Sequence, residues 1–314
     1  MNFIQQAYKG KNDWVYYLGG IMLVIFGWQF LGILPLLVTA IMYSEDISEF
    51  SRAAGDSFMT LGINKNLFLF MMILMFAIGL IFLFIAIKFI HKRAVKTLIT
   101  SRESIDWSRF WFGFITWGIL GAVMIFIGIL FEPESYTWNF KPVPFFTLVF
   151  ISFLFLPLQT SFEELFFRGY FMQGLGTWFK NRWVPLIVTS VAFGLLHGAN
   201  PEVEKLGYIS MVFYIGTGFF FGITTLMDEG TELALGLHAI NNIIAAFLVT
   251  TDWMVFQTDA LFIDTSEPSV GIEMFLPVFV LYPLMLLLFS KKYKWSNWKE
   301  KLFGRIEKPI AIEK

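Results

Sequence analysis

Two adjacent acids, Glu163 and Glu164, lie in the run LQTSFEELFFRGYF, at the end of an apolar stretch that begins near Pro144. A carboxylate near the centre of a membrane helix costs roughly 2.5 to 3.5 kcal/mol on insertion scales. Acids inside an apolar segment are therefore functional candidates by default. These two glutamates are the first residues of the chain that could perform chemistry.

Two histidines follow the acids inside further apolar runs, His197 in AFGLLHGAN and His238 in LGLHAINN. Asn242 comes four residues after His238, so on a helix the two side chains share one face. A single histidine on an apolar helix is more often a packing residue than a functional one. Two imidazoles, an amide and two acids in neighbouring apolar segments favour acid–base or metal chemistry.

Arg168 lies four residues after Glu164, which on a helix places the acid and the base on one face as an ion pair. Glu163 then points about 100° away from that pair. The spacing predicts that Glu164 is neutralised by Arg168, whereas Glu163 stays free to act. The alternative is a buried Glu–Arg pair that fixes helix packing and does nothing more.

The composition is that of a polytopic membrane protein. Of the 314 residues, 57% are hydrophobic and only 15% are charged, and the mean hydropathy is +0.67. The net charge of −1 gives no basic surface for nucleic acid. The absence of cysteine excludes disulfides, a thiolate zinc site and a cysteine nucleophile. The N-terminus has no small-residue cleavage site, so we expect it to be uncleaved.

Hydropathy predicts an all-α, polytopic membrane bundle of about eight transmembrane helices, since a span needs about 20 apolar residues. The candidate spans are residues 15–42, 67–90, 110–131, 144–176, 183–199, 206–227, 231–252 and 270–290. The loop 91–109 carries five Lys and Arg residues, and the tail after residue 290 is equally basic. The positive-inside rule therefore predicts that this loop and both termini are cytoplasmic, and we expect a bacterial plasma membrane.

Two smaller features accompany this topology. The acidic turn from Asp228 to Glu232 lies on the predicted cytoplasmic side, against the general charge pattern. Aromatic and aliphatic residues recur at helical spacing among the lysines of the tail, which predicts a helix lying in the inner interface of the bilayer. They are Trp295, Trp298, Leu302 and Ile306.

The rise of 1.5 Å per residue places the candidate residues at compatible depths in the membrane. Glu163 and His197 each lie roughly 20 Å from the cytoplasmic face when counted from the helix ends expected at Gly176 and Trp183. His238 and Asn242 lie roughly 10 to 16 Å deep by the same count. The sequence therefore predicts that these side chains converge.

Three short motifs occur in this part of the chain, EELFFR from Glu163 to Arg168, FGLLH from Phe193 to His197, and HAINN from His238 to Asn242. They resemble the EExxxR, FxxxH and HxxxN motifs of the CPBP family. This family comprises CAAX proteases and bacteriocin-processing membrane proteins, including the type II CAAX prenyl endopeptidases. The resemblance covers about residues 145–250 and suggests a protease core over 144–252. Hydropathy adds N-terminal transmembrane helices over 1–143, and a last helix and basic tail over 253–314.

The resemblance implies an all-helical intramembrane glutamic protease. In such an enzyme Glu163 and His197 activate a water, His238 and Asn242 form the oxyanion site, and Glu164 with Arg168 supports the structure. No cofactor is implied. Zinc is the alternative because two His and one Glu form a known catalytic zinc set, although the chain has no HExxH.

The expected partners are the lipid bilayer and a protein or peptide substrate, with a membrane-anchored substrate among the options and no nucleic acid. The sequence does not indicate whether the substrate is prenylated. Polar residues inside helices also build transporters, and a non-catalytic immunity or scaffold protein of the same fold is a further alternative. A transporter should show polar residues that reach both faces of the membrane. Here the polar cluster is confined to the second half of the chain, so the sequence favours the protease.

Overall fold

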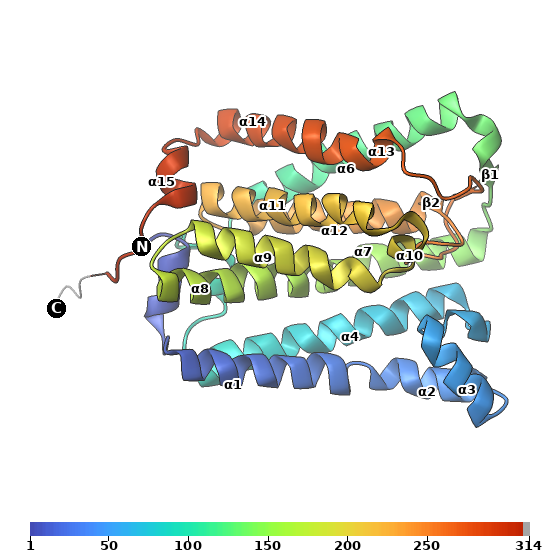
Figure 1. Ribbon diagram of the computed structural model, residues 1–314, viewed down its shortest axis with the longest axis horizontal. Helices are drawn as coiled ribbons and strands as arrows, with labels where there is room; N and C mark the ends of the chain where they lie inside the picture. The colour runs from blue at the N-terminus through green and yellow to red at the C-terminus, as the bar shows by residue number, and fades with distance from the viewer. Residues whose placement is uncertain (310–314) are drawn as a thin grey trace.

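Long apolar segments form the bundle seen in the computed structural model, which describes residues 1–309 (Figure 1). Within these residues, six helices are long and apolar enough to cross a membrane: Trp14–Tyr43, Lys65–Ile90, Trp107–Phe131, Pro142–Phe179, Tyr208–Asp228 and Met274–Tyr293. Two further predicted spans are shorter apolar helices, Trp183–Ala199 and Glu232–Phe247. The all-α polytopic class is confirmed.

The helices that precede the glutamate pair are broken by short 3₁₀ and π turns. In chain order the elements are η1 (Ile4–Lys9), α1 (Trp14–Ile25), η2 (Phe26–Leu31), α2 (Leu34–Tyr43), α3 (Ile47–Ala53), η3 (Ala54–Asp56), η4 (Met59–Leu61), α4 (Lys65–Ile85), η5 (Ala86–Ile90), α5 (Lys96–Ile99), α6 (Trp107–Phe131), η6 (Pro133–Ser135) and β1 (Tyr136–Trp138).

The second half of the chain contains the candidate residues. Its elements are α7 (Pro142–Glu164), η7 (Leu165–Phe171), α8 (Met172–Phe179), α9 (Trp183–Leu196), η8 (His197–Ala199), α10 (Pro201–Leu206), η9 (Tyr208–Ser210), α11 (Met211–Asp228), α12 (Glu232–Phe247), β2 (Val249–Thr250), β3 (Phe262–Asp264), α13 (Ile272–Leu276), η10 (Pro277–Leu281), α14 (Tyr282–Tyr293) and α15 (Trp298–Phe303).

Glycines allow the helices around the site to approach closely. A Cβ at Gly236 of α12 would lie 2.0 Å from the carbonyl oxygen of Phe110 in α6, and one at Gly218 of α11 would lie 2.4 Å from that of Ser190 in α9. Small residues at helix contacts are the usual means of tight packing between membrane helices. Gly236 therefore fixes the position of α12 two residues before His238.

The two ends of the bundle differ in structure. At one end, which we call the basic end, Arg102, Arg109, Arg182 and Lys301 gather beside η1 and α15. At the other, the sheet end, three short strands pair in the order β1-β3-β2, with β1 antiparallel and β2 parallel to β3. Figure 1 shows the two ends at opposite sides of the bundle.

Ion pairs at the basic end account for the acidic turn that opposed the charge pattern. Arg102 lies 2.9 Å from Asp228 and 3.1 Å from Glu232, and Arg182 lies 3.0 Å from Glu229. Arg109 also pairs with Asp228. The acids of this turn are therefore neutralised by arginines of neighbouring segments.

The apolar residues of the basic tail pack on the protein, whereas their spacing had predicted a helix in the inner interface of the bilayer. The helix α15 is only one and a half turns long, and Trp295 and Ile306 are buried on either side of it. Trp295 Nε1 donates to Asp228 Oδ1 at 3.0 Å. The aromatic residues of the tail thus find partners in the bundle, and the acidic turn supplies one of them.

Candidate active site

The glutamate pair lies where α7 ends and the π turn η7 begins. Neighbouring positions on a helix point about 100° apart, and the two carboxylates accordingly differ in burial. The Glu164 side chain is fully buried, whereas 11% of the Glu163 side chain is exposed. π turns inside α-helices are frequent at functional sites. Glu163 is the acid of the pair that reaches the edge of the packed core.

Glu164 forms the ion pair that its spacing predicts. Its Oε1 lies 2.9 Å from Nη1 of Arg168, and both side chains are fully buried. Nη2 of Arg168 donates to the carbonyl oxygen of Gly218 at 3.1 Å, and the guanidinium lies 4.4 Å from the ring centre of Phe193. The pair therefore joins η7 to α11 in an aromatic environment.

His238 contacts both glutamates; the sequence predicted that it lies near Glu163 but not that it bonds to Glu164. Its Nδ1 lies 2.9 Å from Oε1 of Glu164, and its Nε2 lies 3.6 Å from Oε2 of Glu163. Its ring is stacked on Phe221 at a centre distance of 5.0 Å. An ionised carboxylate can only accept, so Nδ1 donates to Glu164. The Nε2 contact is longer than a hydrogen bond.

The spacing from Arg168 predicted that Glu163 has no partner, but two polar side chains face its carboxylate. Nε2 of Gln159 donates to its Oε1 at 3.3 Å, and His238 faces its other oxygen. Gln159 precedes Glu163 by four residues and so shares its helix face. That spacing was visible in the sequence, and it is the signal that could have identified Gln159 as a site residue.

His197 lies at the end of α9 and is half-buried. Its Nδ1 is 2.9 Å from the carbonyl oxygen of Phe193. Because a carbonyl can only accept, Nδ1 carries the hydrogen and Nε2 is the nitrogen with the free lone pair in the neutral ring. His197 thus presents a basic nitrogen, and its own helix fixes which nitrogen that is.

The structure does not bring His197 into contact with Glu163. Within residues 1–309 no hydrogen bond or ion pair links His197 to Glu163, Glu164 or His238. The ring of His238 lies 5.8 Å from that of Phe193, one helical turn before His197. The depth estimate placed both residues at one level, but depth says nothing of rotation about the helix axis. The predicted convergence is therefore only partial in this structure.

Asn242 lies one turn beyond His238 on α12 and is half-buried. Its Oδ1 accepts from Nδ2 of Asn241 at 3.3 Å, and Oδ1 of Asn241 accepts from Nε1 of Trp117 at 3.1 Å. This chain of hydrogen bonds uses the acceptor atom of Asn242 and leaves its amide hydrogens available as donors. Neither Trp117 nor Asn241 was a predicted site residue.

The comparisons with known proteins include a family model that covers the same part of the chain. The sequence model for the type II CAAX prenyl endopeptidase Rce1-like family matches residues 142–244. The chain is also 31% identical over 252 residues, 80% of its length, to the uncharacterized protein YyaK of Bacillus subtilis (strain 168), of which the match covers 83%. The chain belongs to this family of CAAX-type membrane proteases. No solved structure matches it.

The Rce1-like region holds every residue that the motifs singled out, from Glu163 in α7 to Asn242 in α12. Zinc would need Glu163 and both histidines at one point. Among the residues that the structure describes, no group of three or more His, Asp or Glu side chains could hold a metal ion. Because His197 stands apart from the other two, the residues as arranged here do not fit the zinc set.

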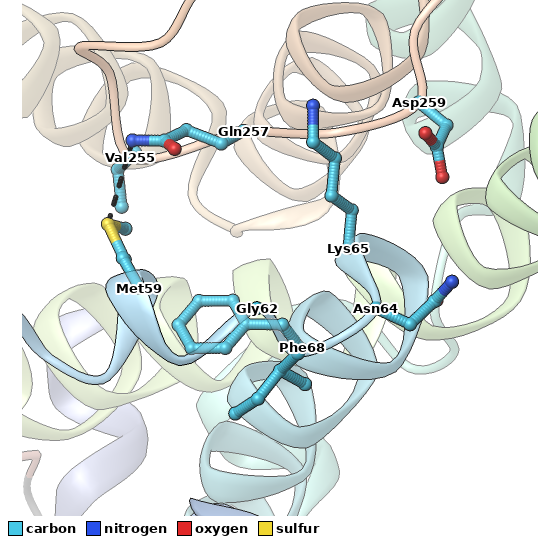
Figure 2. Close-up of a pocket in the computed structure, with 9 residues that line it drawn as sticks. Met59, Gly62, Asn64, Lys65, Phe68, Val255, Gln257 and Asp259 are labelled. Carbon is cyan, nitrogen blue, oxygen red and sulfur yellow. Dashed lines mark hydrogen bonds between the residues drawn. The ribbon is translucent and has the colours of Figure 1, made fainter. Parts of the chain in front are cut away.

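A cavity of about 400 Å³ opens at the sheet end, away from these residues (Figure 2). Its walls come from the start of α4 and from the loop between β2 and β3, and they include Lys65, Val255, Gln257 and Asp259. Nε2 of Gln257 contacts the sulfur of Met59 at 3.7 Å across it. No predicted site residue lines this cavity, so it is not the candidate active site of the Rce1-like region.

Proposed function

We propose that this chain is an intramembrane endopeptidase that hydrolyses a peptide bond by means of a water activated by Glu163 and His197. The observation that supports this best is the difference between the two glutamates. Glu164 is fully buried and holds Arg168 and His238, whereas Glu163 reaches the edge of the core with one oxygen facing His238. A buried base at the margin of a polar cluster is suited to take a proton from water.

In the proposed reaction the water oxygen bonds to the substrate carbonyl carbon while a water proton passes to Glu163. Asn242 donates an amide N–H to the oxyanion that forms. His238 already donates through Nδ1 to Glu164, so a second donation through Nε2 needs the doubly protonated ring. With that ring, the positive charges of His238 and Arg168 would balance the two negative charges of Glu163 and Glu164. Each such donor is worth about 2.7 to 4 kcal/mol in soluble proteases.

In the second half of the proposed reaction, the leaving group needs a proton donor. His197 takes the second water proton on Nε2, from the hydroxyl of the tetrahedral intermediate, and delivers it to the amide nitrogen as the C–N bond breaks. The products are a carboxylate and an amine, and Glu163 returns the first proton to solvent. Since no hydrogen bond joins His197 to Glu163 among residues 1–309, their approach in the substrate complex is part of the proposal. Catalytic contacts often tighten only when substrate binds.

The proposed substrate is a protein or peptide reached from the bilayer, and a prenylated C-terminus is one class that the family name suggests. We propose that water activation needs no metal. From the arginines and lysine gathered at the basic end, we propose that this end faces the cytoplasm of a bacterial plasma membrane. A reporter fused after Arg102 or Lys294 should then read cytoplasmic, and one inserted near Asp259 should read external.

The proposal is tested by comparing membrane peptide fragments from cells that express wild type, Glu163→Gln or Glu134→Gln. Glu134 is an exposed acid in η6 and serves as the matched control. We expect fragments that are present in wild type and Glu134→Gln cells and absent with Glu163→Gln. An identical fragment set in all three would favour a non-catalytic role. Cleavage that is lost in a chelator and restored by zinc would favour the metal alternative.

A further inference from the structure

His197 lies face to face with a tyrosine that none of the motifs includes. The ring centres of His197 and Tyr214 are 4.5 Å apart and their planes are inclined by only 18°. The hydrogen bond from Nδ1 to Phe193 orients the ring edge, and the stack on Tyr214 fixes the plane of the ring. Together the two contacts determine where Nε2, the free basic nitrogen, points.

Tyr214 is itself held by a buried carboxylate. Its hydroxyl donates to Oε1 of Glu202, a residue of α10 that is only 4% exposed. Nδ2 of Asn200 donates to the same oxygen at 3.1 Å and to the Tyr214 hydroxyl at 3.3 Å, and the backbone N–H of Val255 donates to Oε2 at 3.1 Å. Glu202 is thus held by its neighbour Asn200 and by two other segments, α11 and the loop between β2 and β3, and each of its oxygens has a donor.

From this arrangement we propose that Tyr214, anchored by Glu202, is a positioning residue for His197 in the proposed peptide hydrolysis. The inference rests on the proposed function. A cation over an aromatic face is stabilised, whereas a neutral imidazole gains much less. The tyrosine therefore helps most when His197 carries the extra proton that it later gives to the leaving amine. An interaction that strengthens only then raises kcat and leaves KM unchanged.

The link to Val255 extends this arrangement to the sheet end. Val255 lines the cavity shown in Figure 2, and its N–H is bonded to the carboxylate that holds Tyr214. The position of His197 thus depends on the loop between β2 and β3 as well as on α9. No motif residue makes this connection.

The test uses three substitutions and a matched control. Tyr214→Leu removes the ring, Tyr214→Phe keeps the ring and removes its link to Glu202, and Glu202→Gln removes the charge of the anchor. Tyr208→Leu is the control, because Tyr208 is 85% exposed one turn before α11. The substrate is the one that Glu163→Gln fails to cleave.

We expect Tyr214→Leu to lower kcat by roughly 2- to 30-fold, the range of a lost cation–π contact, with KM unchanged. Tyr214→Phe and Glu202→Gln should lose less, and Tyr208→Leu nothing. The melting temperature of each variant is measured beside the rates. Should Tyr214→Leu fail to fold, Tyr214→Phe and Glu202→Gln still decide the question through the split between kcat and KM.

A second readout does not depend on cleavage. The chain has three histidines, so the ring protons of His197 can be assigned by NMR from the signals that vanish in His197→Gln. A stacked tyrosine shields them, and Tyr214→Leu should move them downfield while Tyr208→Leu leaves them in place. No shift, or a kcat of Tyr214→Leu equal to wild type, would overturn the proposal. A protein that lacks Glu163-dependent cleavage but shows the NMR shift would instead reject the protease function itself.

Discussion

The two sides of the candidate site are built in different ways. On one side, Glu164, Arg168 and His238 are buried, and both contacts that Glu164 makes are 2.9 Å long. On the other side, His197 is half-buried and is held by one hydrogen bond and a ring stack. Glu163 lies at the edge of the first side and has no hydrogen bond to the second within the described residues.

This difference indicates that the Glu164 side of the site is rigid, whereas the His197 side can adjust its position. Charges without water are stable only when they are paired and hydrogen-bonded, so the Glu164 side cannot rearrange without leaving an unpaired charge. The His197 side makes contacts that cost less to shift. We therefore expect substitutions of Glu164 and Arg168 to act mainly on folding, and substitutions on the His197 side to act mainly on the reaction.

The largest expected effect belongs to Arg168→Gln. It leaves Glu164 buried without its cationic partner, and a broken buried pair costs roughly 3 to 5 kcal/mol. Poor accumulation and a lowered melting temperature should follow. The double variant Glu164→Gln with Arg168→Gln should recover much of the stability, since no lone charge remains. A stable but inactive Arg168→Gln protein would mean that the arginine acts on the reaction, and the comparison would fail.

The next effect is a dependence of folding stability on pH. It arises from His91, which contacts η7 near the basic end. His91 Nε2 lies 2.8 Å from the hydroxyl of Tyr170 in η7, and Nδ1 lies 2.8 Å from the carbonyl oxygen of Lys11. Burial lowers the pKa of the His91 imidazole from 6.5 to about 4, with Arg93 acting in the same direction and the bond to Lys11 opposing it.

Between pH 6.5 and 4 the unfolded chain therefore binds a proton at His91 that the folded chain does not. Stability is complete above pH 6.5 and falls as the pH drops toward 4, by at most about 3 kcal/mol. Thermal unfolding measured across this window should show the fall, and His91→Gln should flatten it. An equal fall in both proteins would assign the pH dependence to other groups.

A smaller loss is expected from Gly236→Ala, which tests whether close packing holds α12 in place. The added Cβ would lie 2.0 Å from a backbone oxygen of α6, so α12 must shift. Overpacking of this kind costs about 1 to 3 kcal/mol. Gly19→Ala is the control, because its Cβ would meet nothing within 4 Å. Equal melting temperatures for the two variants would show that the contact has no bearing on stability.

The smallest effect should come from Trp117→Phe, which removes the hydrogen bond to Asn241. A single bond of this type is worth about 1 kcal/mol. We expect a slightly less stable protein whose cleavage is reduced several-fold, since Asn241 orients Asn242. Trp111→Phe on the exposed face of α6 should change neither quantity. Full cleavage by the Trp117→Phe protein would show that the role of Asn242 does not depend on these hydrogen bonds.

Local spacing predicted part of this site and could not predict the rest. The Glu164–Arg168 pair follows from positions i and i+4 on one helix. The contact of His238 with Glu164 joins residues 74 positions apart, so it depends on how α12 packs against α7. Helix depth placed His197 level with Glu163, but neither rotation nor the π turn after Glu164 can be read from depth. Tyr214 and Glu202 meet only through the fold.

The span count shows the same limit. Hydropathy found the six long helices, and it also counted the segments of α9 and α12, which form shorter apolar helices. His197 directly follows α9, and His238 lies within α12. The glycines and polar residues of these two helices fit them for packing inside a bundle, and such a pattern is hard to separate from a spanning helix by composition alone.

The central claim is that the two neighbouring glutamates divide the work, and a pair of isosteric substitutions tests it most directly. Melting temperature and substrate cleavage are measured for Glu163→Gln and Glu164→Gln side by side. The account predicts that Glu163→Gln melts with the wild type and forms no product, whereas Glu164→Gln melts lower because Arg168 loses its anion. A Glu163→Gln protein that still cleaves, beside a stable and inactive Glu164→Gln protein, would contradict it.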